Sequence, residues 1–269
     1  KIPSDSINHE DMRMFYYAYL NQNNNDKVSL WGERIAFLFP YDSEIIASLA
    51  THYNGANQPG RAEEVAKNYI SQCDSTNLYV NKEYAYSLFM QFKYDEAIPL
   101  YEKLIAQGFD NFESNFVLGL CYENQPNKEE ALKHYQKAVQ FKSDNATCLF
   151  HLALAEKALN MDSLSMAHFN QSLEVSLPKD RALQTYKWLA DLHFQHSRYA
   201  DAARDFELCI LYDEEDDPLN NYNAAQMFIA SKNKLKAKQH LQMFLANANR
   251  LEDKKEAAQL ISKAKEQLK

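Results

Sequence analysis

The stretch YDEAIPLY at residues 94–101 decides the fold, because its pattern returns as KEEALKHY at residues 128–135. In both stretches an alanine, Ala97 or Ala131, precedes a tyrosine by four residues. Small residues continue this series, with successive spacings of 34, 34, 37 and 35 residues, at Ser165, Ala202 and Ala237. A period of this length is typical of stacked helical hairpins, each of which buries its apolar face against its neighbours. The sequence therefore predicts an all-α solenoid.

Two further positions of the repeat support this interpretation. If each small residue of the series is position 20, position 1 falls at Leu78, Phe112, Ala146, Leu183 and Pro218. Position 8 is then small in every repeat, at Ala85, Gly119, Ala153, Ala190 and Ala225. Position 24 is large and apolar, at Tyr101, Tyr135, Phe169, Phe206 and Leu241. A small residue lets the two helices of a hairpin approach closely, and a large residue fills the space between neighbouring helices.

This alternation of small and large residues resembles the tetratricopeptide repeat family over residues 78–247. The resemblance implies a right-handed α-solenoid of helical hairpins, in which the first helices line a concave groove. Two positions depart from the family pattern. Glu156 stands where an aromatic residue is usual, and Ala224 stands where a larger residue is expected. We expect the packing to differ locally at both.

The repeat pattern weakens toward both ends of the chain. Residues 1–77 are predicted to form degenerate hairpins of the same kind, because apolar residues recur there at helical spacing. Residues 78–249 hold five well-matched repeats. Residues 250–269 are rich in Lys, Glu and Ala with apolar residues on one face, which predicts a C-terminal capping helix. One continuous solenoid accounts for the chain and leaves no room for a catalytic domain.

Composition narrows the functional classes. Five Gly and seven Pro in 269 residues are too few for an all-β or dinucleotide-binding domain. A net charge of -8 repels phosphate backbones, so we expect no nucleic-acid partner. No apolar stretch reaches the roughly 20 residues needed to span a bilayer. The four cysteines are far apart, and we expect buried thiols, with one bridge left open: Cys73, Cys121, Cys148 and Cys209.

The sequence carries no recognisable catalytic or cofactor motif, so we predict a protein that is not an enzyme and holds no cofactor. The best residual metal candidate is the pair His193 and His196, with Asp191 nearby. His193 falls at position 11, an inward position of the family, so a core or groove histidine is the favoured interpretation. Cys148 and His151 form a weaker pair that lacks further ligands. We predict neither catalytic nor metal-binding residues.

The groove is where we expect a protein or peptide partner to bind. The resemblance implies that positions 2, 5, 9 and 12 of each repeat face it. Apolar and aromatic residues at these positions would anchor a partner segment, and charged ones would set its register, among them Glu113. The predicted groove residues are Tyr79, Lys82, Tyr86, Phe89, Phe116, Leu120, Phe150, Leu154, Lys187, Asp191, Phe194 and Tyr222. The Lys and Asn pair with which chaperone-binding members grip a carboxylate is absent.

Three alternatives to an open groove stay possible at this point. Tighter packing would bury these side chains, or the N-terminal segment of the chain would fill the groove. Alternatively, the same surface or an uncapped end of the array would make a self-associating structural scaffold. A metal-binding or enzymatic role is the least favoured. The first residue, Lys1, and the high Asn and Tyr content favour an exported bacterial cell-envelope protein over a cytoplasmic one.

Overall fold

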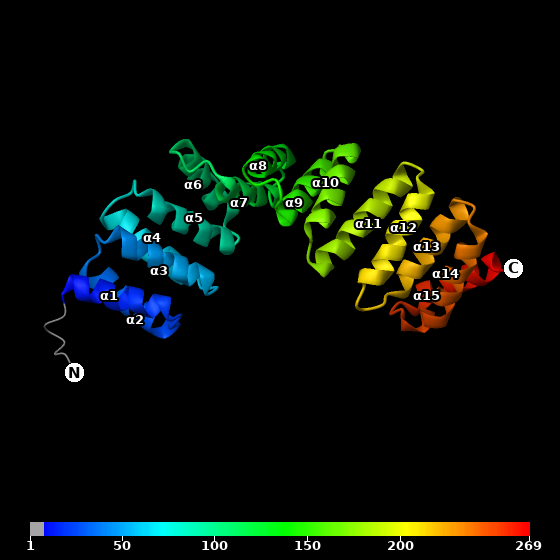
Figure 1. The fold of residues 1–269 in the computed structure, drawn as a ribbon, viewed down its shortest axis with the longest axis horizontal. Coiled ribbons are helices and arrows are strands. Elements are labelled where there is room, and N and C mark those ends of the chain that lie inside the picture. The colour runs from blue at the N-terminus through cyan, green and yellow to red at the C-terminus, as the bar shows by residue number, and fades with distance from the viewer. Residues whose placement is uncertain (1–7) are drawn as a thin grey trace. The chain divides into compact units, whose positions relative to one another are not determined.

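A computed structural model describes residues 8–269, and every regular element in that range is helical. The predicted all-α fold of helical hairpins is confirmed. The first seven residues, which begin the predicted segment 1–77, lie outside the described residues. The chain divides into two compact units, residues 1–142 and 143–269. Figure 1 shows the helices of each unit running back and forth as antiparallel pairs.

Unit 1 contains four helical hairpins within its described residues. In order these are α1 (His9–Asn21) with α2 (Asn25–Leu38), α3 (Ser43–Gly55) with α4 (Pro59–Gln72), α5 (Leu78–Met90) with α6 (Tyr94–Ala106), and α7 (Phe112–Glu123) with α8 (Lys128–Phe141). The first helix of the third hairpin, α5, packs along α3, whereas α5 and α7 touch over only a short stretch. This difference leaves space on the α7 side of α5.

Unit 2 contains three further hairpins and a final helix. The hairpins are α9 (Ala146–Ala158) with α10 (Asp162–Val175), α11 (Lys179–Gln195) with α12 (Tyr199–Tyr212), and α13 (Pro218–Ala230) with α14 (Lys234–Asn247). A short 3-10 turn, Ala248–Arg250, leads to α15 (Lys254–Gln267). Ala264 of α15 packs with Leu241 and Phe244 of α14, so α15 covers the last hairpin as predicted.

Most helices begin at an Asn or Asp whose side chain accepts a hydrogen bond from the third residue of the helix. Asn77, Asn111 and Asn145 cap α5, α7 and α9 in this way. Such a cap satisfies one of the backbone N–H groups that the first turn leaves without a partner. The tight turn inside a hairpin often contains a residue with positive φ, such as Asn160 or Phe92. The turns therefore use polar residues and backbone geometry in place of glycine.

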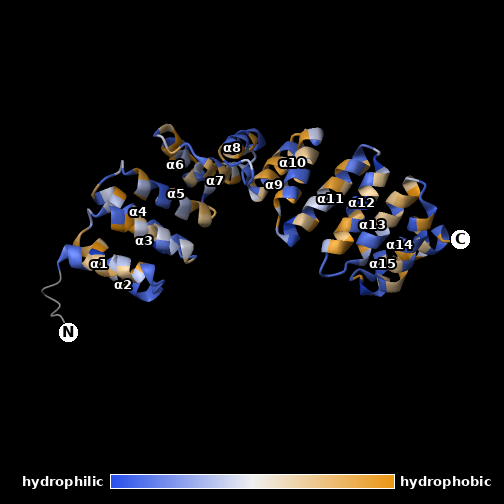
Figure 2. Ribbon diagram, viewed as in Figure 1, coloured by the Kyte–Doolittle hydropathy of each residue, from blue (hydrophilic) through white to orange (hydrophobic). Residues whose placement is uncertain are grey.

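The repeat positions read from the sequence form the interior of each hairpin. Position 8 and position 20 are buried in all five repeats, and Figure 2 shows hydrophobic and hydrophilic residues alternating around the helices. At Gly119 a Cβ atom would lie 2.6 Å from Cε1 of the fully buried Tyr135 ring. No side chain fits there without displacing that ring, so glycine is required at this close approach.

Two details differ from the repeat pattern. Helix α11 begins at Lys179, one turn before the expected Leu183, because Pro178 supplies an extended residue that starts the helix early. Glu156 is 1% exposed, and its Oε2 atom lies 2.8 Å from Nδ1 of His168 on α10. The contact with His168 thus takes the place of the packing that an aromatic side chain at position 156 would have made.

Candidate functional site

One cavity of unit 1 brings together residues from the first helices of three successive hairpins. We call it the unit 1 groove; it has a volume of about 430 Å³ and is lined mainly by α3, α5 and α7. Five of the predicted groove residues line it, namely Lys82, Tyr86, Phe89, Phe116 and Leu120. Its volume lies in the range of small-ligand pockets. The α7 side of α5 is therefore hollowed by a cavity large enough to hold a small ligand.

Aromatic side chains form much of the wall of the unit 1 groove. On α7, the rings of Phe112 and Phe116 stack with centroids 5.6 Å apart. On α5, the rings of Tyr86 and Phe89 lie 5.8 Å apart. Tyr101 of α6 closes the inner side; it is buried, and burial raises the pKa of its hydroxyl well above the usual value. The wall is therefore largely aromatic, and the raised pKa of Tyr101 keeps its hydroxyl protonated.

Polar groups gather at one side of the same cavity. Lys82 Nζ lies 3.3 Å from an oxygen of Glu113 and 3.7 Å from an oxygen of Glu83. The amide nitrogen of Asn54 on α3 donates to the backbone oxygen and to Oε2 of Glu83, at 3.2 and 3.1 Å. Lys82 of α5 and Glu113 of α7 therefore form an ion pair between the two helices, and their role in setting the register of a partner stays a prediction.

Other predicted groove residues lie elsewhere. Phe150 and Tyr222 are each only 7% exposed, and each packs into a core of unit 2, against Phe169 and Phe244 respectively. Their side chains are not available as surface anchors, because the first helices of unit 2 turn them toward their own second helices. Leu154 is partly buried against the same core as Phe150.

Tyr79 is exposed but does not line the unit 1 groove. Its ring meets Phe109 edge to face, with centroids 5.5 Å apart. Lys187, Asp191 and Phe194 line a smaller cavity of about 190 Å³ in unit 2. Asp191 there already accepts a hydrogen bond from Gln195 and pairs with Lys157. This smaller cavity offers less room and fewer uncommitted polar atoms than the unit 1 groove.

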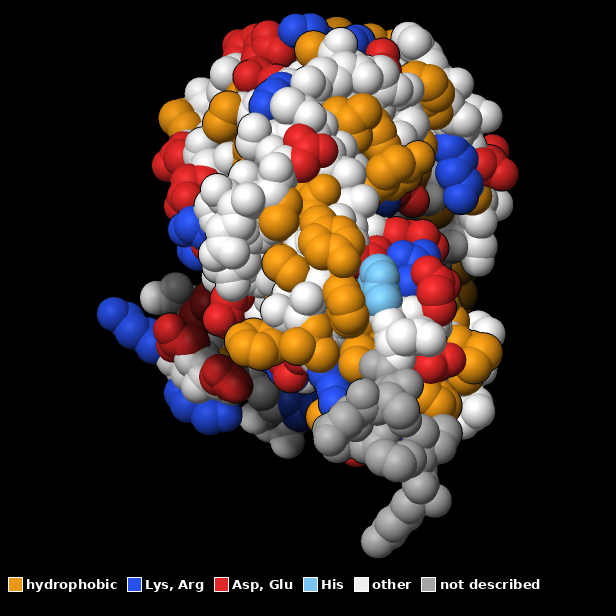
Figure 3. Space-filling model, turned by 90° about the vertical axis from the view of Figure 1, so that its left-hand side faces the viewer, with side chains coloured by type: hydrophobic (Ala, Val, Ile, Leu, Met, Phe, Trp, Pro, Cys, Tyr) orange, Lys and Arg blue, Asp and Glu red, His pale blue; other side chains and the backbone are white. Residues whose placement is uncertain are grey.

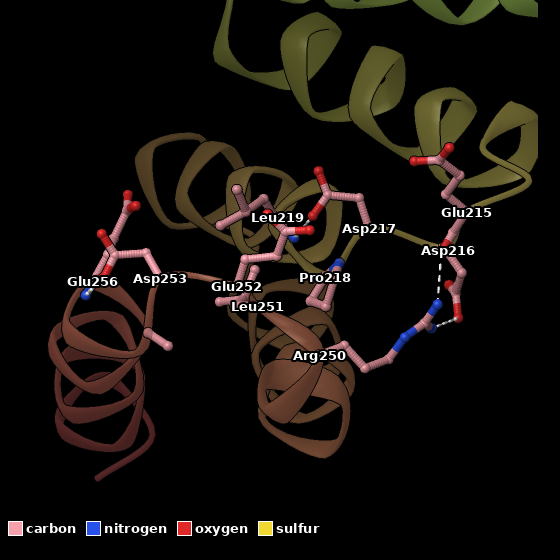
Figure 4. Close-up of a pocket in the computed structure, with 11 residues that line it drawn as sticks. Glu215, Asp216, Asp217, Pro218, Leu219, Arg250, Leu251, Glu252, Asp253 and Glu256 are labelled. Atoms are coloured by element: carbon pink, nitrogen blue, oxygen red, sulfur yellow. Dashed lines mark hydrogen bonds and ion pairs between the residues drawn. The ribbon is translucent and has the colours of Figure 1, made fainter.

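A second sizeable cavity of unit 2, shown in Figure 4, is acidic. It lies where α13 and α15 begin, and three of its carboxylates have a structural role. Asp217 and Asp253 cap these two helices, and Asp216 pairs with Arg250 at 2.7 Å. Asp213, in the preceding loop, accepts hydrogen bonds from the backbone of Glu215 and Asp217. These contacts explain the acidic residues at 213–217 as a capped and hydrogen-bonded connection between α12 and α13.

The first hairpin carries apolar side chains on its outer surface. Figure 3 shows hydrophobic side chains gathered among charged ones on the side of the molecule from which α1 and α2 are seen. Met14, Leu30 and Phe37 of these helices are exposed by 62, 61 and 85% respectively. In a repeat array such a face is covered by a preceding hairpin or by a capping segment.

The two histidines of the predicted pair do not act together. His193 is buried and its Nδ1 lies 2.6 Å from Asp205, whereas Nε2 of His196 lies 2.8 Å from Asp162. Burial raises the pKa of the Asp205 carboxyl above its usual value, although the hydrogen bond from His193 opposes this effect. Within residues 8–269 no cluster of three or more His, Cys, Asp or Glu side chains could hold a metal ion.

Three of the four cysteines are buried, as expected, and burial raises the pKa of each of these thiols to about 12: Cys121, Cys148 and Cys209. Cys73 is exposed, contrary to expectation, because it follows the last turn of α4 instead of lying inside it. No disulfide joins the four within the described part of the chain.

Asn54 and Phe112 are among the lining residues of the unit 1 groove that sequence reasoning missed. Asn54 belongs to the degenerate hairpin α3–α4, whose groove positions were not assigned. The signal was present: if the buried Ala50 is position 8, Asn54 is position 12, a groove position. Phe112 is position 1 of its repeat and lines the cavity because α7 stands away from α5.

Known proteins match this chain in sequence and in structure. A family model described as anaphase-promoting complex, cyclosome, subunit 3 matches residues 90–162. DnaJ homolog subfamily C member 3 of Gallus gallus is 23% identical over 173 residues, which is 61% of this chain but only 34% of the relative. MamA residues 41 to the end from Desulfovibrio magneticus RS-1 superposes with a TM-score of 0.57 at 16% identity, covering 63% of this chain and 97% of that one. A crystal structure of MamA gives a TM-score of 0.55 at 19% identity, covering 60 and 93%.

Together with the hairpin interior, these matches support the tetratricopeptide repeat family. The fold of the chain is a solenoid of tetratricopeptide-like hairpins. The matched segment spans only about a third of the length of the curated relative. Among the described residues, no helix has both the length and the apolar character needed to cross a membrane.

Proposed function

We propose that this chain is a protein-interaction scaffold, and that its unit 1 groove binds a peptide or a segment of a protein partner. The repeat fold supports an interaction scaffold in general, because stacked hairpins expose an extended surface. The observation that carries the specific proposal is the convergence of Lys82, Tyr86, Phe89, Phe116 and Leu120 on one preformed cavity.

The residues that line the cavity are better suited to binding a peptide than to catalysing a reaction. Its walls are aromatic, and its charged groups form one shared ion pair cluster around Lys82. Aromatic anchors in a preformed pocket supply most of the binding free energy at protein interfaces. The absence of catalytic activity and of a nucleic-acid partner stays a prediction.

A random dodecapeptide library displayed on phage tests the proposal. We expect the wild-type chain to enrich groove-binding peptides that no longer bind Phe89→Ser, since Phe89 lines the cavity and is partly exposed. The matched control is Phe141→Ser, which makes the same chemical change at an exposed position outside the cavity. Both variants must show wild-type helicity. Peptides that bind Phe89→Ser as well as the wild type would place the binding surface elsewhere.

Self-association is a second candidate function, and the exposed apolar side chains of α1 and α2 favour it. A second copy could cover Met14, Leu30 and Phe37 and remove them from water. The test is the mass of the chain as a function of concentration. We expect a dimer of the wild type that Leu30→Lys dissociates, whereas a monomer at all concentrations rejects this candidate.

A further inference from the structure

We propose that the unit 1 groove receives a basic side chain of its partner, with arginine the best fit. This inference rests on the proposed function and adds the chemistry of the anchor. The groove offers hydrogen-bond acceptors, an excess of carboxylates and aromatic walls, and these three features together suit a cation with an apolar stem.

The acceptor comes from Asn54. This residue is 4% exposed and lines the groove, and its Oδ1 atom is buried without a hydrogen-bond partner among the described residues. The orientation of the amide is fixed, because its nitrogen donates to two oxygens of Glu83. Turning the amide over would set its oxygen against the Glu83 carboxylate. A buried acceptor without a partner is unfavourable, so a ligand donor that displaces the groove side chains covering Oδ1 and reaches it would gain a hydrogen bond.

The charges of the groove also favour a cation. Two carboxylates, Glu83 and Glu113, share a single ammonium group, that of Lys82, at 3.7 and 3.3 Å. The lining therefore carries one more negative than positive charge. This excess of negative charge would repel an anionic ligand and attract a cationic one. This is the reverse of a carboxylate-gripping groove.

The walls fit the rest of an arginine side chain. The stacked rings of Phe112 and Phe116 and the pair Tyr86 and Phe89 present aromatic surface on both sides of the groove. A guanidinium group stacks on aromatic faces and has five donors for several acceptors at once, and its methylene stem packs on apolar surface. The cavity of about 430 Å³ leaves room for an adjacent apolar side chain.

Four matched heptapeptides test the inference. Each is acetylated and amidated and has the sequence Gly-Ser-Leu-X-Leu-Ser-Gly, in which X is Arg, Lys, Gln or Glu. The full chain is labelled with nitrogen-15, and the shifts of the Asn54 side-chain amide and of the groove backbone are followed by NMR. We expect the Arg peptide to bind about tenfold more tightly than the Glu peptide, with Lys second.

Two charge variants sharpen the test. Glu113→Gln removes a groove carboxylate that is 70% exposed, so the chain should fold normally. We expect Glu113→Gln to reduce the ratio of the Arg-peptide affinity to the Glu-peptide affinity about threefold. The control Glu129→Gln, at an exposed position outside the groove, should leave this ratio unchanged. The inference is overturned if the Arg and Glu peptides bind equally, or if Glu113→Gln leaves the ratio of their affinities unchanged.

The two proposals fail in different ways. If the phage library yields groove-dependent peptides that need no basic residue, the arginine inference is wrong and the proposed function stands. If the library yields no peptide and none of the heptapeptides shifts the groove signals, both are wrong. If the heptapeptides shift signals outside the groove only, the inference is wrong.

Discussion

Exchanging the two members of the buried pair Glu156 and His168 is a direct test of the hairpin packing. In this hairpin the acid is at position 11 of the first helix and the histidine at position 23 of the second, with 2.8 Å between Oε2 and Nδ1. The next hairpin has the same contact in reverse order, from His193 to Asp205 at 2.6 Å. We therefore expect Glu156→His to be rescued by His168→Glu.

The size of the effect follows from burial. Breaking a fully buried ion pair by removing one partner costs about 3–5 kcal/mol of unfolding free energy, and a charge-assisted hydrogen bond contributes about 1.5–3 kcal/mol. Glu156 is 1% exposed, but the His168 side chain is 25% exposed, so water replaces part of the lost contact. Each single substitution should cost about 2–3 kcal/mol, and the double exchange should cost less than about 2 kcal/mol.

The assay is urea unfolding followed by tryptophan fluorescence. The chain has two tryptophans, so Trp31→Phe leaves Trp188 of α11 as the only reporter, in unit 2. The exposed Glu174→His is the control and should change stability by less than about 0.5 kcal/mol. If the double exchange costs as much as the two single substitutions together, the two positions do not form an interchangeable pair.

Three further outcomes are expected. Gly119→Ala should destabilise the chain by about 1–2 kcal/mol, since its Cβ would meet the Tyr135 ring at 2.6 Å, whereas Gly60→Ala, with open space around it, should be neutral or stabilising in urea unfolding. Burial, with smaller effects of two lysines, holds the pKa of His134 below its usual value of 6.5. The stability that the neutral His134 contributes is therefore fully present above pH 6.5 and is lost as the pH falls through the pKa of the folded state. The stability lost in His134→Gln should therefore shrink between about pH 7.5 and about pH 5.5. In the native chain a thiol reagent should modify Cys73 quickly and the three buried cysteines only on unfolding; fast modification of more than one thiol contradicts the burial.

The sequence predicted the fold through positions whose side chains are fixed by close packing. A small residue at Gly119 opposite a large one at Tyr135 is a local constraint, and such constraints repeat with the period of the hairpin. The candidate groove was harder to predict. Assigning positions 2, 5, 9 and 12 to the groove assumes that every first helix has the same spacing from its neighbours. Helix α5 instead lies close to α3 and apart from α7, which opens the cavity there.

The contact between Glu156 and His168 could not be predicted from the repeat pattern either. A family pattern marks Glu156 as a departure but does not name its compensating residue, which lies twelve positions away on the second helix. The burial of Phe150 and Tyr222 likewise depends on how far each helix is rotated about its axis, and apolar residues fit both a groove and a core.

The reversed order of the two acid–histidine pairs makes neighbouring hairpins of unit 2 non-interchangeable during folding. If α9 paired with α12 in the same register, Glu156 would face Asp205, and two buried carboxylates would repel each other. If α11 paired with α10, His193 would face His168 and neither would find an acid. Repeats that are alike in shape invite such exchanges, between adjacent hairpins and between molecules. Each of these two hairpins therefore has an acid–histidine contact that only its own two helices can form. Pairing with a helix of the neighbouring hairpin would lose that contact, which disfavours misassembly.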